Sequence, residues 1–156
     1  SSYRFFFYGD GAQRKQLEQI VKEQQISNVV FKEKRIPLEE CAWVVSQATV
    51  NVMNYAKNFG HMGVSSGKMF QYLAAGKPIV CNIDIKYDNV IEDNNLGVAR
   101  DICTAEEFAT EIQRIAELPK ESILLTSAPR SNIRFNTEKA LSAFSSVDKS
   151  VNLLLS

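Results

Sequence analysis

The chain has 156 residues, of which 45% are hydrophobic and 23% charged, a composition that excludes wholesale disorder and predicts one globular domain over residues 1–156. Eighteen basic residues balance eighteen acidic ones, so the net charge gives no support to a nucleic-acid binder or a membrane-surface polycation. The three cysteines are far apart and lack Cys-x-x-Cys spacing. They predict neither a disulfide framework nor a zinc site, and they fit a reducing, intracellular setting.

The beginning of the chain carries no leader pattern. Its apolar run is too short for a signal peptide, and no stretch of about eighteen apolar residues predicts a transmembrane helix. The sequence opens almost directly on a strand, which suggests a piece of a longer protein.

The first half of the chain alternates between strand and helix patterns. An aromatic strand over residues 3–8 precedes an amphipathic helix around residues 17–21. A strand over residues 28–32 precedes a helix that begins near Pro37, and a third strand follows over residues 49–55. The apolar stripe expected on the second helix is Leu38, Cys41, Ala42 and Val45, with Trp43 packed beside it.

The second half continues the alternation. A glycine-containing loop over residues 57–66 leads into a short helix ended by Gly76, and strands follow over residues 78–83 and 97–100. A capping box at Thr104 begins another helix, and the tail from about Thr137 is helical in pattern. Strands separated by helices predict an α/β fold, with a parallel sheet covered on both faces and ligands bound at the carboxyl ends of its strands.

The helix start after residue 64 carries the most information. Ser65 or Ser66 can cap the helix, and Gly67 lets an anion approach its free backbone N–H groups. Lys68 adds a positive charge where the helix dipole alone prefers a negative one, and a bound phosphate would explain it. The spacing puts Lys68, Gln71, Tyr72 and Ala75 on one face, with Phe70, Leu73 and Ala74 toward the sheet. The alternative is an ordinary solvated face beside a buried one.

The run Ser-Ser-x-Lys-x-x-Gln-Tyr-Leu-Ala-Ala-Gly-Lys-Pro-Ile-Val over residues 65–80 resembles the donor-binding segment of group-1 glycosyltransferases of the GT-B type. Weaker similarities follow the same order at residues 7–11, 28–31 and 95–97, so the resemblance extends from about Phe5 to Phe144. It implies a Rossmann-like C-terminal half of a GT-B enzyme, which binds a nucleoside-diphosphate sugar.

The resemblance also implies roles for individual residues. Those at the helix start would hold the donor diphosphate: Ser65, Ser66, Gly67, Lys68 and Met69. Gln71 would contact the ribose, and the loop of Lys34, Arg35 and Ile36 would face the base. The residues expected to line the cleft are Gly9, Asp10, Gly11, His61 and Gly63.

The sequence departs from the family at a catalytic feature. The family's two glutamates, eight positions apart, map onto Gly63 and Gln71, so no catalytic residue is assigned and the stereochemical outcome stays open. No cofactor is expected, since the nucleoside-diphosphate sugar is the substrate, and no metal is expected, since Asp-x-Asp is absent. The implied partners are a saccharide or lipid-linked acceptor and an N-terminal acceptor lobe, without which the domain should be inactive. The implied setting is polysaccharide biosynthesis in the cytoplasm, including the inner face of the membrane.

Two other functions stay open. A lobe without the glutamates could bind nucleotide without catalysis, or only scaffold a partner. An NAD(P)-binding domain is less favoured, because the third glycine of the Gly-x-Gly-x-x-Gly fingerprint begun by Gly9 is replaced by Arg14. With a single histidine, no Ser-His-Asp set is available for a hydrolase.

Overall fold

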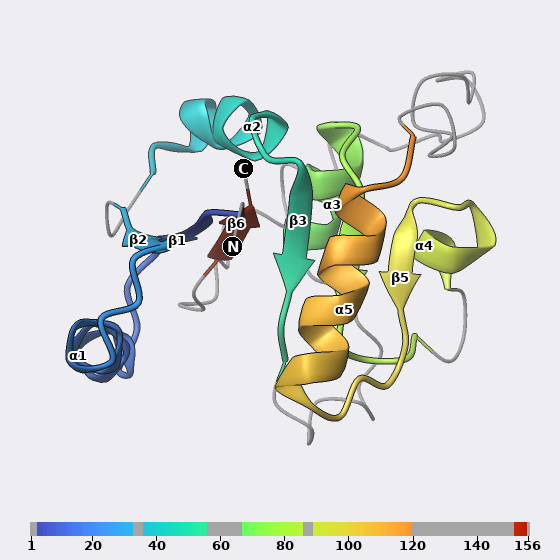
Figure 1. Cartoon of the computed structure of the whole chain (residues 1–156). Coiled ribbons are helices and arrows are strands. Elements are labelled where there is room, and N and C mark those ends of the chain that lie inside the picture. Colours follow the sequence, from blue (N-terminus) through green and yellow to red (C-terminus); the bar gives the residue numbers. More distant parts are fainter. Residues whose placement is uncertain (1–2, 33–35, 56–66, 86–88, 120–151, 156) are drawn as a thin grey trace.

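The chain alternates between strands and helices along most of its length (Figure 1). A computed structural model describes residues 3–32, 36–55, 67–85 and 89–119, and the backbone of 152–155. Its elements in chain order are β1 (Phe5–Tyr8), α1 (Arg14–Glu23), β2 (Val29–Phe31), α2 (Leu38–Ser46), β3 (Val50–Met53), α3 (Gly67–Ala74), β4 (Ile79–Cys81), α4 (Val90–Asp93), β5 (Gly97–Ala99), α5 (Ala105–Ala116) and β6 (Asn152–Leu155).

The strands form one sheet in the order β2-β1-β6-β3-β4-β5. Two groups, β2-β1 and β3-β4-β5, are parallel within themselves, and β6 lies between them antiparallel to both neighbours. The α/β architecture is therefore confirmed, but the expectation of a wholly parallel sheet is wrong at β6. The helical prediction for the tail is wrong at residues 152–155 and otherwise lies outside the described residues. A run of three leucines has no period of its own, so it fits a strand as well as a helix.

Helices cover both faces of the sheet, as in a doubly wound, Rossmann-like arrangement (Figure 1). One hydrophobic cluster joins α2, α3 and α4 to one face, and a second joins α5 to the other. Strand β3 shows the alternation, since Val50 and Val52 belong to the α5 cluster whereas Met53 belongs to the other. Within the described parts of the chain, no helix has the length and apolar character needed to cross a bilayer.

Helix α2 differs from its prediction in which side it buries. Val44 and Val45 are buried, whereas Leu38 is 49% exposed and Trp43 is 66% exposed. The stripe is rotated because α2 contacts α3 as well as the sheet. The expectation that Trp43 packs into the core is therefore wrong.

Two short features, helix α4 and Gly97, lie at the β5 edge of the sheet. Helix α4 was not predicted, because four residues capped by the Asn89 side chain are too few to show helical periodicity. Gly97 begins β5 with φ +146°, and an added Cβ would lie 1.8 Å from the Ile79 carbonyl oxygen. Only glycine fits there, since β4 passes directly over its Cα.

The burial of Cys81 predicts that the fold loses stability at alkaline pH. Its thiol lies in β4 with no exposed surface, and this burial raises the pKa from 9.0 to about 11. The unfolded thiol ionises above pH 9 while the native thiol stays protonated. We therefore expect the free energy of unfolding to keep its full value below pH 9. It should fall by up to ~3 kcal/mol as the pH rises to 11.

Urea unfolding at pH 8–11 measures this loss. Cys81→Ala should lose less stability with pH than the parent, while Cys103→Ala, at an exposed position, should follow the parent. Equal pH dependence in the two variants would contradict the assignment.

Candidate functional site

The strand order reverses at the centre of the sheet. From β1 the chain continues outward to β2, and from β3 it continues in the opposite direction through β4 to β5. Ligands of doubly wound sheets bind at the carboxyl ends of the two strands where the order reverses. Here these ends are Tyr8 of β1 and Met53 of β3, so the candidate site lies between the loop after β1 and the start of α3.

The charges at the helix N-termini single out the same place. Helices α2, α4 and α5 each carry two acidic side chains in the first turn, where negative charge interacts favourably with the helix dipole. Helices α1 and α3 have no acidic residue in the first turn. These two helices follow β1 and β3, so both N-termini that flank the reversal are left able to attract an anion.

The start of α3 is open at its backbone. A Cβ built on Gly67 would meet no atom of the described residues within 4 Å, so these residues leave a ligand room to approach the main chain. Lys68 is half-buried in the same turn. The Met69 side chain is buried in the core, which leaves only its backbone N–H for a phosphate.

The predicted faces of α3 are partly wrong. Tyr72, assigned to the polar face, has no exposed surface, and Ala74, assigned to the sheet, is exposed. The buried residues are Met69, Tyr72 and Leu73, because α3 packs between α2 and β4 rather than on the sheet alone. Burial also raises the pKa of Tyr72, whose hydroxyl has no hydrogen-bond partner among the described residues. Gln71 remains half-buried beside it.

Arg14 holds the loop on the other side of the site. Its side chain is buried, and its guanidinium donates to the carbonyl oxygen of Gly9 and, at 2.7 Å, to that of Lys32. It also donates to the Glu18 carboxylate at 2.7 Å and lies 5.6 Å from the centroid of the Phe31 ring. Arg14 therefore ties the end of β1 to the end of β2.

Sequence reasoning missed this structural role, although it noted Arg14 as a departure from the dinucleotide fingerprint. The available signal was an arginine in the first turn of a helix without acidic residues there. Gly9 itself has φ +113°, a conformation in which glycine is favoured, so the loop begins with a sharp change of direction.

As Arg14 does at β1, the Asn82 side chain clamps the backbone just after the last residue of β3. The Asn82 side chain accepts from the Tyr55 backbone N–H at 2.7 Å and donates to the Tyr55 carbonyl oxygen at 2.9 Å. Asn82 follows β4 and Tyr55 follows β3, so the amide extends the pairing of these strands beyond their last residues. This positions the chain where it leaves the sheet toward α3.

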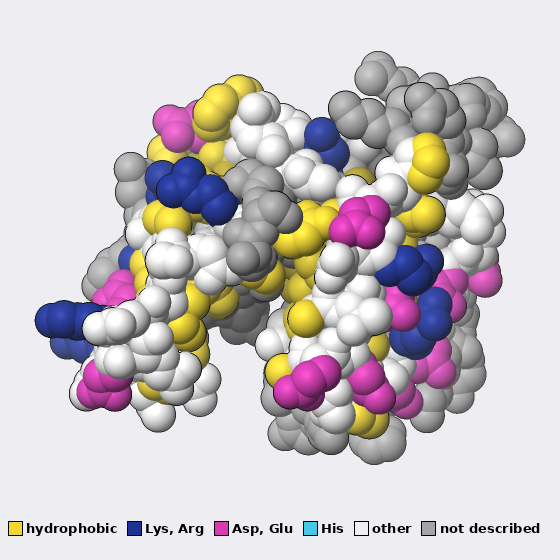
Figure 2. All heavy atoms as spheres, in the orientation of Figure 1, with side chains coloured by type: hydrophobic (Ala, Val, Ile, Leu, Met, Phe, Trp, Pro, Cys, Tyr) yellow, Lys and Arg dark blue, Asp and Glu magenta, His cyan; other side chains and the backbone are white. Residues whose placement is uncertain are grey.

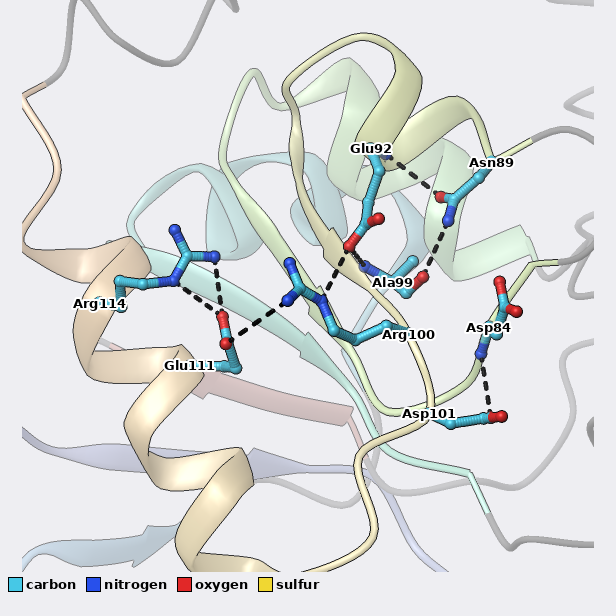
Figure 3. Close-up of polar contacts among 8 residues, drawn as sticks. All are labelled: Asp84, Asn89, Glu92, Ala99, Arg100, Asp101, Glu111 and Arg114. Atoms are coloured by element: carbon cyan, nitrogen blue, oxygen red, sulfur yellow. Dashed lines mark hydrogen bonds and ion pairs between the residues drawn. The ribbon is translucent and has the colours of Figure 1, made fainter.

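Carboxylates beyond β5 are engaged in a structural network (Figure 3). Glu92 of α4 accepts from the Ala99 N–H at 3.2 Å and from Arg100 at 3.1 Å. Arg100 also lies 3.9 Å from Glu111 of α5, which pairs with Arg114. These groups join α4, β5 and α5 on the side away from the strand reversal. Across the described residues, no cluster of three metal-ligating side chains is present.

The structure thus places part of the predicted site at one edge of the sheet. Gly9, Asp10 and Gly11 lie after β1, and Gly67 and Lys68 begin α3. Ile36 precedes α2, half-buried against the cluster that contains Tyr72. The remaining predicted residues lie outside the described part of the chain: Lys34, Arg35, His61, Gly63, Ser65 and Ser66.

Comparisons of the chain with protein-family models, curated proteins and solved structures gave no match. The strand order and the residues at the carboxyl ends of the strands are therefore the features that point to a function.

The Arg14 clamp predicts a large loss of stability for Arg14→Ala. Removing the guanidinium leaves the Gly9 and Lys32 carbonyl oxygens without this donor, and we expect the free energy of unfolding to fall by ~2–4 kcal/mol. Arg14→Lys should recover little, since an ammonium lacks the planar fork that reaches several acceptors.

The matched control is Arg114→Ala. Its exposed ion pair with Glu111 should contribute at most ~1 kcal/mol. Chemical denaturation compares the variants, and similar losses at the two positions would contradict the clamp.

Proposed function

We propose that the chain is the donor-binding domain of a GT-B-type glycosyltransferase, which holds a nucleoside-diphosphate sugar at the carboxyl ends of β1 and β3. The observation that carries this proposal is the start of α3, at the strand reversal. The first turn of this helix carries Gly67 and Lys68, whereas the first turns of α2, α4 and α5 carry acidic residues.

A diphosphate at this position would receive hydrogen bonds from backbone N–H groups in the first turn of α3 and a charge-assisted contact from Lys68. Ser65 and Ser66 would complete the cap of the helix. Together the helix dipole and the lysine would stabilise the negative charge that develops on the leaving nucleotide.

The rest of the donor would extend along neighbouring elements. Gln71 begins the next turn of α3, and its amide can both donate to and accept from ribose hydroxyls. Ile36, together with Lys34 and Arg35, would face the base. The loop Gly9–Gly11 would close the opposite side, held by Arg14.

The reaction itself would pass the sugar to a saccharide or lipid-linked acceptor. In this proposal the acceptor belongs to an additional N-terminal lobe, so the chain alone binds donor without turnover. The whole enzyme would work in the cytoplasm, with access to the inner face of the membrane for polysaccharide biosynthesis.

One alternative is favoured by a specific observation. Gly63 and Gln71 stand where the family carries glutamates, so a domain that binds nucleotide without catalysis fits the same site. An NAD(P)-binding domain fits less well. The buried Arg14 side chain fills the place where the fingerprint requires its third glycine.

A thermal-shift comparison of UDP, GDP, ADP, CMP and NAD tests the proposal. We expect at least one nucleoside diphosphate to stabilise the chain, by ~2.7 kcal/mol at a hundred times its dissociation constant. Stabilisation by NAD alone would contradict a transferase, and stabilisation by none of the five would leave the scaffold alternative.

The assignment of the diphosphate to α3 predicts that Lys68→Ala binds the stabilising nucleotide at least tenfold more weakly. The lost charge-assisted contact corresponds to ~1.5–3 kcal/mol. Titration calorimetry at low salt measures the affinity.

Lys22→Ala is the matched control, since it removes the same charge from an exposed position in the last turn of α1. That turn lies at the amino ends of the strands, away from the candidate site. The affinity of Lys22→Ala for the nucleotide should therefore equal that of the parent. Equal affinity in Lys68→Ala would show that the diphosphate is bound elsewhere.

A further inference from the structure

The two sides of the candidate site differ in how deeply they are buried. Every residue of β3 and of β4 is buried, and Val50, Ile79 and Val80 have no exposed surface. Every residue of β1 and of β2 is only half-buried. The strand that carries Gly9–Gly11 is therefore less well anchored than the strands that hold α3.

The hydrophobic clusters show the same asymmetry. Their buried members all come from residues 44–115. The segment formed by β1, α1 and β2, residues 5–32, is called here the β1–β2 unit. It adds only partly buried residues to the clusters, namely Phe5, Phe6 and Tyr8. Regions with few buried apolar contacts open at lower free energy than the core.

The contacts of Arg14 are internal to the β1–β2 unit. Its three hydrogen-bond partners are Gly9, Glu18 and Lys32, at the end of β1, within α1 and just after β2. The rings of Phe7 and Phe31 also stack, with centroids 5.1 Å apart, across the two strands. These contacts hold the unit together without tying it to the remainder of the sheet.

The backbone link between the unit and the rest of the sheet is β6. Among the strands that the structure describes, β1 pairs with β2 and β6, and β3 pairs with β4 and β6. Leu154 lies opposite both Phe6 and Asn51. Strand β6 has only four residues, so a short strand carries the ladder between two groups.

We propose that the β1–β2 unit opens as one body from the β3-β4-β5 side, with β6 as the strap that holds it closed. The candidate site spans this division, because Gly9–Gly11 moves with the unit while Lys68 stays with α3. Figure 2 shows a hollow between the side that carries α1 and the side that carries α5, with hydrophobic side chains on its walls. A ligand that contacts both sides favours the closed arrangement.

Native-state hydrogen exchange of the unliganded chain tests the proposal directly. Amides of β1 and β2 should exchange at least tenfold faster than those of β4 and β5, and should respond to low denaturant as one group. Uniform protection across β1, β2, β4 and β5 would overturn the proposal.

Leu154→Pro tests the strap. Proline removes a backbone donor from a strand paired on both sides. We expect β1 and β2 to lose protection together while β4 and β5 keep theirs. Leu154→Ala, which retains the N–H, should keep β1 and β2 protected. Unchanged protection of β1 and β2 in the proline variant, or loss of protection throughout the chain, would overturn the proposal.

A third exchange experiment, with the nucleotide bound, links the opening to the candidate site and rests on the proposed function. The nucleoside diphosphate that stabilises the parent should slow exchange in β1 and β2 more than in β4 and β5. Equal slowing would overturn the claim that the site spans the division. Absence of any ligand effect, with the unliganded exchange pattern intact, would instead contradict the proposed function.

Discussion

The structure depends on one constraint, the backbone pairing at the centre of the sheet. Without β6, the sheet would have a gap between β1 and β3, and each of these strands would have one unpaired edge. Unpaired N–H and C=O groups inside a sheet have a high energetic cost. Strand β6 satisfies both edges at once. The strand order also reverses at this gap. The pairing that completes the sheet therefore holds α1 and α3 on either side of the candidate site.

The two sides of that edge are built differently. On the β3 side, the Asn82 amide extends the sheet, and the Glu92–Arg100–Glu111 network joins α4, β5 and α5. On the β1 side, one buried arginine organises a loop whose residues 9–13 are half-buried or exposed. The well-buried β3-β4-β5 side therefore faces a less buried loop after β1. This arrangement suits a ligand that must enter before both sides contact it.

Much of this fold follows from local pattern, and the exceptions have physical causes. The five strands β1–β5 and the capping box at Thr104 and Glu107 were predicted, because alternation and capping are local properties. Strand β6 was not, since its pairing joins residues far apart in the sequence. The assignment of Gly67 and Lys68 to the candidate site came from a local motif and stays a prediction. The burial of Tyr72 and the clamp of Arg14 depend on neighbours from other elements, which a local pattern does not contain.

The exposure of Trp43 has a consequence for how the molecule is observed. It is the only tryptophan, and two thirds of its surface already meets solvent in the folded chain. Indole emission responds to the polarity around the ring, so intrinsic fluorescence reports on the surface of α2 rather than on the melting of the core. Tyr72, fully enclosed between α2 and β4, is the better chromophore for the interior, through near-ultraviolet circular dichroism.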